Sequence, residues 1–279
     1  MTKKQDIHGT DWDYLIVLDA CRYDYFKQNY KDFLQGDLKK VKSRGSATPE
    51  WLWNTFDGKR YNYNYISANP YINNQDLSLG DLVSGQEHRT WNATDKFTNI
   101  IDSWIQDWDN ELNTVRPEKL TDTALENLNR SKTIIHYIQP HRPFISLGET
   151  DFEWAPKGRL EGEEDSLLRK ILDATRPLWN PIRQKAPKTL ESKLKETLNL
   201  GNQYEKLARK HGEEQTRKYY TKDLKMALEQ IERLVKELDG KIVVTSDHGE
   251  LLGENQEWGH YIGGKHEKLL DVPWLKVER

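Results

Sequence analysis

The sequence of 279 residues has a single cysteine, Cys21, which excludes an intrachain disulfide. No apolar run approaches the roughly 20 residues that a membrane-spanning helix needs. The N-terminal residues include lysines but no apolar segment after them, so we expect no secretory signal. These absences together predict a cytoplasmic protein without a transmembrane segment.

The chain also lacks a strong charge of either sign, with a formal net charge of -3. This balance gives no general electrostatic reason to bind nucleic acid or an anionic membrane. An anionic substrate would have to be held by local positive groups or by a metal ion. The sequence gives no indication of the oligomeric state.

No linker, internal repeat or low-complexity tract divides the sequence, so we expect a single domain over residues 1–279. The length is sufficient for one large α/β domain with a sizeable core. The chain is very polar, with 35% hydrophobic and 31% charged residues. Ten tryptophans stand out: they either fill the core in place of aliphatic residues or form a platform for a carbohydrate or a base.

Apolar runs predict buried strands, and helical periodicity predicts the segments between them. The expected strands are Tyr14–Ala20, Tyr63–Ala68, Thr133–Ile138, Ile242–Thr245 and Val272–Val277, the last at an edge or a strand start because of Pro273. The expected helices are Pro49–Phe56, Lys96–Trp108, Pro117–Leu128, Leu167–Leu178, Leu190–Leu198 and Leu224–Leu238.

This alternation predicts an α/β fold in which helices cover both faces of a mostly parallel sheet, in three α/β/α layers. Residues 148–240 show no strand signal, and we expect a helical insertion there, before the last motif strand. Within it, Thr150–Gln184 is a candidate lid. Ligands of such sheets bind at the carboxyl ends of the strands.

Candidate metal ligands follow two of the expected strands. Asp19 ends the first run, and the pair Asp247–His248 follows the run Ile242–Thr245. Two carboxylates and a neutral imidazole suit Mn²⁺ or Zn²⁺, whereas purely oxygen ligation would suit Mg²⁺ or Ca²⁺. His260 offers a further imidazole. A turn aspartate with a surface histidine is the alternative for the isolated pair, but Asp19 at a second strand end favours a metal site.

Hydroxyl groups cluster at an expected loop-to-helix junction, in Ser43-Arg-Gly-Ser-Ala-Thr-Pro-Glu-Trp51. A hydroxyl at this position can lose its proton to become a nucleophile, because a helix N-terminus and a nearby metal stabilise negative charge. The alternative is that Thr48 only caps the helix that begins at Pro49.

A third candidate segment is His136-Tyr-Ile-Gln-Pro-His-Arg-Pro-Phe144. It places His141 and Arg142 in a loop after a strand, where they can face a substrate oxygen. His136 lies within the apolar run, and we expect it to be a packed core residue. Arg22, Arg44 and Arg142 are candidates for holding an oxyanion, although an isolated arginine more often forms a surface ion pair.

Taken in order, these segments resemble the alkaline phosphatase superfamily in its sulfatase-like branch. The similarity covers Leu18-Asp-Ala-Cys-Arg-Tyr-Asp24, Ser46-Ala-Thr-Pro-Glu-Trp51, the His136–Phe144 segment and Thr245-Ser-Asp-His-Gly-Glu-Leu-Leu-Gly253, followed by Trp258-Gly-His260 and Leu270-Asp-Val-Pro-Trp274. It implies hydrolysis or transfer of an anionic ester through a covalent intermediate on Thr48. It further implies that Asp19, Asp247 and His248 bind metal, that His141 faces the substrate, and that the substrate is a small or glycan-linked ester.

The chain departs from this superfamily in three ways. Cys21 is in the wrong motif to become a formylglycine, and neither Ser43 nor Ser46 is followed by proline two residues later. Phosphoryl chemistry is therefore favoured over sulfate hydrolysis, and we expect phosphodiesters to be the substrates. Gln139 stands where two-metal members have an aspartate, so we expect one metal ion, with His141 and His260 binding substrate oxygens or a weak second ion. The chain is also short, and residues 148–240 would have to provide specificity.

Two alternatives stay open at this point. The first is a sulfuric-ester or phosphonate hydrolase on the same scaffold. The second is a protein of this fold that binds a partner or an anionic glycan without catalysis, since a shared fold does not ensure activity.

Overall fold

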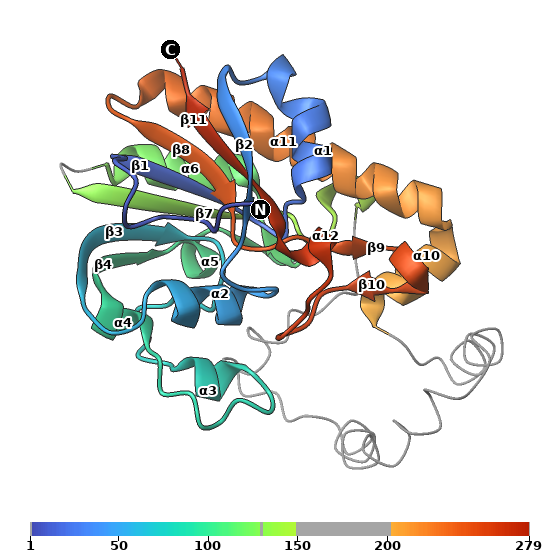
Figure 1. The fold of residues 1–279 in the computed structure, drawn as a ribbon, viewed down its shortest axis with the longest axis horizontal. Helices are drawn as coiled ribbons and strands as arrows, with labels where there is room; N and C mark the ends of the chain where they lie inside the picture. Colours follow the sequence, from blue (N-terminus) through green and yellow to red (C-terminus); the bar gives the residue numbers. More distant parts are fainter. Residues whose placement is uncertain (1, 129–130, 149–201, 279) are drawn as a thin grey trace.

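The computed structural model describes residues 2–128, 131–148 and 202–278 (Figure 1). The strands are β1 (Tyr14–Asp19), β2 (Gly36–Lys42), β3 (Tyr61–Ser67), β4 (Phe97–Asp102), β5 (Trp108–Asp109), β6 (Thr114–Val115), β7 (Lys132–Pro140), β8 (Ile242–Ser246), β9 (Leu251–Leu252), β10 (Trp258–Gly259) and β11 (Asp271–Val277). The α-helices are α1 (Tyr23–Asn29), α2 (Thr48–Thr55), α3 (Leu79–Leu82), α4 (Ala93–Lys96), α5 (Ser103–Gln106), α6 (Pro117–Glu126), α10 (Gln203–His211), α11 (Glu213–Glu237) and α12 (Glu267–Leu270). Short 3₁₀ turns are η1 (Tyr30–Asp32), η2 (Ile145–Leu147) and η3 (Glu254–Gln256).

The described strands form a seven-stranded central sheet in the order β2-β11-β8-β1-β7-β3-β4. β8, β1, β7, β3 and β4 run parallel to one another, and β11 pairs antiparallel with both β8 and β2. The carboxyl ends of four adjacent strands, β8, β1, β7 and β3, therefore meet at one edge of the sheet. This edge is where a ligand is expected to bind.

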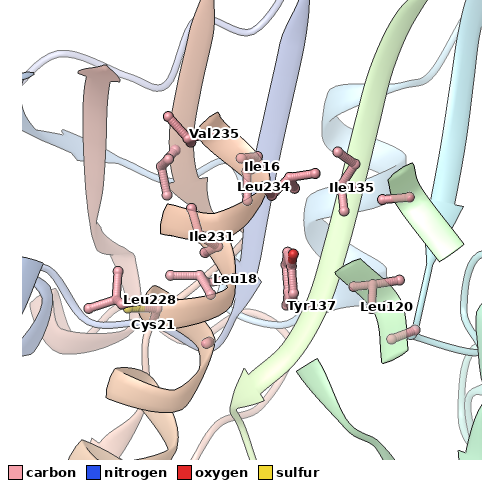
Figure 2. Packing of buried hydrophobic residues seen from close by; sticks show 14 of the residues in the cluster. Ile16, Leu18, Cys21, Leu120, Ile135, Tyr137, Leu228, Ile231, Leu234 and Val235 are labelled. Carbon is pink, nitrogen blue, oxygen red and sulfur yellow. The ribbon is translucent and has the colours of Figure 1, made fainter. Parts of the chain in front are cut away.

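Side chains alternate along β1 and divide the core into two layers. Ile16 and Leu18 face one cluster, which packs against α6 and α11, whereas Leu15 and Val17 face the other cluster, which packs against α2. Figure 2 shows the first layer, where Leu228, Ile231 and Leu234 of α11 lie over β1 and β7. Both faces of the sheet are thus covered, and the predicted three-layer α/β/α arrangement with a mostly parallel sheet is confirmed.

All five predicted strands are present, within one or two residues of their expected ends. Of the two positions expected for Val272–Val277 because of Pro273, the edge is wrong, since β11 lies between β2 and β8, whereas Pro273 does lie near the start of the strand. Sequence analysis did not identify β2, because its exposed lysines hide its pattern. The helix predicted over Lys96–Trp108 is wrong in its first half, where Phe97–Asp102 forms β4 and only Ser103–Gln106 is helical. Its apolar residues at helical spacing instead pack as a strand beside β3.

The other helix predictions fall into two groups. Pro49–Phe56, Pro117–Leu128 and Leu224–Leu238 correspond to α2, α6 and α11, and α11 begins earlier than expected. In the insertion expected over 148–240, the structure describes α10 and α11; the helices expected over Leu167–Leu178 and Leu190–Leu198, and the lid over Thr150–Gln184, lie outside the described residues. Among the described helices, none is both long and apolar enough to cross a membrane.

Candidate functional site

The predicted metal ligands come together at the carboxyl edge of the sheet. β1 and β8 are parallel neighbours with Leu18 paired to Ser246, so Asp19 and Asp247 each follow the last paired residue of their strand. Both side chains continue the face that packs on α2. His248 follows directly, and all three side chains are buried.

Asp247 is held by backbone and side-chain donors on both oxygens. Its Oδ1 accepts hydrogen bonds from the backbone N–H of Ala20 at 3.1 Å and of His248 at 2.7 Å. Its Oδ2 accepts one from the hydroxyl of Thr48 at 2.7 Å. The carboxylate therefore has a fixed orientation, with Oδ2 directed towards the first turn of α2.

His248 presents a single ring nitrogen to the carboxylates. Its Nδ1 lies 2.8 Å from the carbonyl oxygen of Gly249, and because a carbonyl can only accept, Nδ1 carries a proton. Nε2 lies 3.4 Å from Oδ1 of Asp19 and 3.6 Å from Oδ2 of Asp247. A backbone acceptor that fixes the tautomer in this way is typical of metal-binding histidines.

Asp19 is oriented by Asn69, which follows β3. The amide of Asn69 donates to Oδ2 of Asp19 at 2.8 Å, and its own Oδ1 accepts from the backbone of Tyr71 at 2.9 Å. Oδ1 of Asp19 has no hydrogen-bond partner among the described residues. Burying a carboxylate oxygen without a hydrogen-bond partner lowers the stability of the fold unless a cation is present.

The electrostatics of the site indicate a demand for positive charge. Burial and the negative charge of Asp247 raise the pKa of Asp19 to about 6. Burial alone lowers the pKa of His248, but Asp247 and Asp19 outweigh this effect and raise it to about 10. The two carboxylates thus favour a bound proton, and a divalent cation at the same position would neutralise more of their negative charge.

The spacing of these atoms also fits a metal ion. Two ligands about 2.0–2.1 Å from one tetrahedral Zn²⁺ lie roughly 3.3–3.4 Å apart. The distances from His248 Nε2 to the two carboxylates, 3.4 and 3.6 Å, are close to this value. The distances from His248 to the two carboxylates and the donor types are therefore compatible with such an ion.

Thr48 is the hydroxyl that the fold brings to this site. It is the first residue of α2, and its N-cap is Ala47, so the alternative that Thr48 caps the helix is wrong. Its Oγ1 lies 2.7 Å from Asp247 Oδ2 and 3.3 Å from His248 Nε2. The other candidate hydroxyls point elsewhere: Ser43 donates to the carbonyl of Asp247, and Ser46 bonds to Glu50 and the carbonyl of Tyr261.

A second group of side chains lies beside the first and consists of His141, Glu250 and His260. One ligand atom from each lies within 4.8 Å of the others. Nδ1 of His260 is 3.0 Å from Oε1 of Glu250, and the ring of His260 is centred 4.2 Å from that of His248. Burial and the neighbouring His260 lower the pKa of His141 well below its usual value, so its ring is neutral. The fold thus brings both predicted substrate-facing histidines to the same edge.

The three candidate arginines have different surroundings. Arg22 is buried and forms ion pairs of 2.7 Å with both Asp24 and Glu254. Arg44 donates to the backbone carbonyl of Gln5 at 3.1 Å. Arg142 stacks on the ring of Tyr204, 4.1 Å from its centre, next to His141 in the chain. Of the three, Arg142 is the one adjacent to the histidines of the site.

Three residues of the site were not among the sequence candidates. Asn69 orients Asp19, Glu250 orients His260, and His136 faces Asp247, with Nε2 at 3.7 Å from Oδ2. His136 was expected in the core and is indeed fully buried, and burial lowers its pKa to about 4. Strand alternation in β7 could have indicated its direction, because Ile134 and His136 share the face opposite Ile135 and Tyr137.

Comparisons with known proteins were made by sequence and by structure. No family model and no curated protein sequence matches the chain. The soluble domain of lipooligosaccharide phosphoethanolamine transferase A from Neisseria meningitidis is similar in structure, with 12% identity and a TM-score of 0.49 over 98% of this chain and 79% of that chain. The C-terminal periplasmic domain of EcEptC from Escherichia coli, in complex with Zn, has 14% identity and a TM-score of 0.47 over 98% and 75%.

A further similar structure is the phosphonate monoester hydrolase SpPMH from Silicibacter pomeroyi, with 14% identity and a TM-score of 0.45 over 100% of this chain and 68% of that chain. All three structures are less than 25% identical to this chain, so the similarity is one of fold alone.

The comparisons correct the expected location. The prediction of a cytoplasmic protein is contradicted, because several of the similar structures are described as periplasmic domains. The sequence features behind that prediction were insufficient. A single cysteine excludes an intrachain disulfide, but a protein without disulfides is compatible with an oxidising compartment as well as with a reducing one.

Proposed function

We propose that this chain is a metal-dependent enzyme that hydrolyses or transfers phosphate esters, in particular phosphodiesters, through a phosphothreonine at Thr48. The observation that carries the proposal is the position of the Thr48 hydroxyl. It is buried at the N-terminus of α2, donates a hydrogen bond to Asp247 and lies close to His248. The two carboxylates of this site favour a bound positive charge. Hydroxyl nucleophiles are activated by such an adjacent carboxylate and a metal.

In this proposal Asp19, Asp247 and His248 hold one divalent ion, with Zn²⁺ or Mn²⁺ as the best match to their mixed oxygen and nitrogen donors. When bound, the ion would lower the pKa of the threonine hydroxyl and neutralise charge on the phosphoryl oxygens. The N-terminus of α2 adds a favourable partial positive charge at the same place.

The side chains of this chain account for the remaining steps. The Oγ1 of Thr48 forms a bond to phosphorus, and Asp247 Oδ2 takes the hydroxyl proton. The bond between phosphorus and the leaving oxygen breaks, and His260, held by Glu250 through Nδ1, supplies that oxygen with a proton from Nε2. His141 and Arg142 orient the ester. Water or an acceptor alcohol then forms a bond to phosphorus and gives its proton to Nε2 of His260, the bond between phosphorus and Oγ1 of Thr48 breaks, and Asp247 returns its proton to Oγ1.

The test compares metal-dependent turnover of a chromogenic phosphodiester by the wild type, Thr48→Ala and Thr55→Val. Thr55 is a matched control, because it is buried on the same helix and its hydroxyl has no partner among the described residues. We expect Thr48→Ala to lose at least about 1,000-fold in kcat/KM and Thr55→Val to keep the wild-type rate. Equal rates for the wild type and Thr48→Ala would contradict the proposal.

A panel of sulfate, phosphonate, phosphomonoester and phosphodiester substrates separates this function from the other ester hydrolases. Preference for the diester supports the proposal. The segment 148–240 was expected to supply specificity, but its helix α11 packs against the central sheet as part of the core. Of this segment we propose residues 149–201, which lie outside the described residues, as the source of specificity. Chimeras that exchange only these residues should change the preferred ester and leave the metal affinity unchanged.

A further inference from the structure

His136 is a fully buried histidine whose Nε2 has no hydrogen-bond partner among the described residues. It lies in the middle of β7, paired with Val17 of β1 and Ser67 of β3. Leaving a buried polar atom without a partner costs roughly 1–3 kcal/mol. A core position in the central sheet would be filled at lower cost by an aliphatic residue, so the imidazole calls for an explanation.

The two ring nitrogens of His136 face different surroundings. Nδ1 lies 2.9 Å from the hydroxyl of Tyr65, which is itself fully buried on β3. Nε2 lies on the side of the carboxylates, 3.7 Å from Oδ2 of Asp247. One ligand atom from each of His136, Asp19 and Asp247 lies within 4.8 Å of the others. The ring is therefore anchored at one nitrogen and aimed at the carboxylate pair with the other.

We propose that Nε2 of His136 is a further ligand of the divalent ion, approaching from within the sheet, with Tyr65 as its outer partner. This inference rests on the metal site of the proposed function and adds a second imidazole to it. Two carboxylates and two imidazoles form a mixed oxygen and nitrogen donor set that suits Zn²⁺, which can expand to five ligands and so still take the Thr48 oxygen or the ester, and it disfavours Mg²⁺, which prefers oxygen ligands.

The contact with Tyr65 matches this role. A ligating Nε2 carries no proton, so the ring proton is on Nδ1 and is donated to the oxygen of Tyr65. An outer partner that accepts this proton fixes the tautomer and the ring plane of a metal-binding histidine. The packing of the ring against Trp51, with centroids 6.0 Å apart, holds the ring from the side of α2.

The test is X-ray absorption spectroscopy of the full chain loaded with one equivalent of Zn²⁺, which counts the bound imidazoles. The wild type is compared with His136→Asn and with His8→Asn, whose exposed ring stacks on Tyr61 away from the carboxylates. We expect one imidazole fewer in His136→Asn than in the wild type, and no change in His8→Asn. The Zn²⁺ affinity of His136→Asn should fall by more than the roughly 10- to 100-fold loss typical of an outer partner.

Other results would overturn the inference in distinguishable ways. If the wild type and His136→Asn bind Zn²⁺ through the same number of imidazoles, His136 is not a ligand, although the proposed function stands. If the wild type binds no Zn²⁺, both proposals fail. Tyr65→Phe preserves the packing, and we expect it to keep the imidazole count while its Zn²⁺ affinity falls about 10- to 100-fold. An unchanged affinity in Tyr65→Phe would exclude the outer-partner role of Tyr65.

Discussion

The hydroxyl of Thr48 lies 2.7 Å from Oδ2 of Asp247, although 199 residues separate the two in the sequence. One comes from the first turn of α2 and the other from the end of β8. The parallel pairing of β8 with β1 places Asp19 at the same edge. The fold thus holds the threonine hydroxyl beside two carboxylates that repel each other. Such an arrangement is expected of a site built for function at some cost in stability.

The repulsion between the carboxylates leads to a prediction for Asp19→Asn. Burial and Asp247 raise the pKa of Asp19 to about 6, above its value in an unfolded chain, so its ionisation destabilises the fold as pH rises through 6. Without metal at pH 8, we expect Asp19→Asn to be more stable than the wild type by on the order of 1–3 kcal/mol.

Added metal should reverse this order. An ion at 100 times its Kd stabilises the wild type by about 2.7 kcal/mol, and Asp19→Asn should gain much less. Chemical denaturation with and without Zn²⁺ measures both effects. Lower stability of metal-free Asp19→Asn, together with a full response to Zn²⁺, would show that Asp19 is not part of the site.

The sequence predicted the central strands and the site aspartates because buried parallel strands are continuous apolar runs. It failed where two structures share one pattern: Phe97, Ile100 and Ile101 fit both a helix and a strand, and only the neighbouring β3 decides between them. β2 was not identified because an edge strand with exposed lysines has no apolar run.

The sequence indicated the candidate ligands that the fold brings together, but not the residues that contact and orient them. Asn69 contacts Asp19 and Glu250 contacts His260, and both contacts form only when separate segments meet in the folded chain. Isolated polar residues between helices and strands carry no periodic signal in the sequence. His136 was correctly expected to be buried. Its direction towards Asp247 depends on the register of β7 against β1, which the sequence does not reveal.

The contact between Asn69 and Asp19 predicts the effect of Asn69→Asp. This change replaces the amide donor with a third carboxylate 2.8 Å from Oδ2 of Asp19, so Asp19 loses its orientation. We expect metal affinity to fall roughly 10- to 100-fold, as measured by competition with a chelator. Asn64→Asp is a matched control, because Asn64 is buried on β3, the strand that precedes Asn69, and bonds to Asn99 and Asn127. A similar loss of affinity in both variants would indicate a general effect of a buried charge.

Arg22 and Asp24 predict a dependence of stability on acid pH. Burial alone raises the pKa of Asp24, but Arg22 and Lys268 outweigh it and lower the pKa to about 2. Because the folded pKa is below the unfolded value of 3.8, this stabilisation is present above pH 4 and is lost as pH falls towards 2.

Asp24 is partly exposed, so solvent screening limits its contribution to no more than about 1 kcal/mol. We expect Asp24→Asn to be less stable than the wild type at pH 6 and to lose less stability between pH 4 and pH 2. Urea denaturation at several pH values measures the difference. Parallel pH profiles in the two proteins would exclude this role for the ion pair.

The central claim is that the phosphoryl group passes through Thr48. Its most direct test is peptide mapping by mass spectrometry after acid quenching of the metal-loaded enzyme during turnover of a phosphodiester. We predict on Thr48 a phosphoryl group that still carries the undisplaced ester group of the diester, and this adduct should appear during turnover and disappear when the substrate is exhausted. Metal-dependent turnover with no such adduct on Thr48 at any time point would contradict the account.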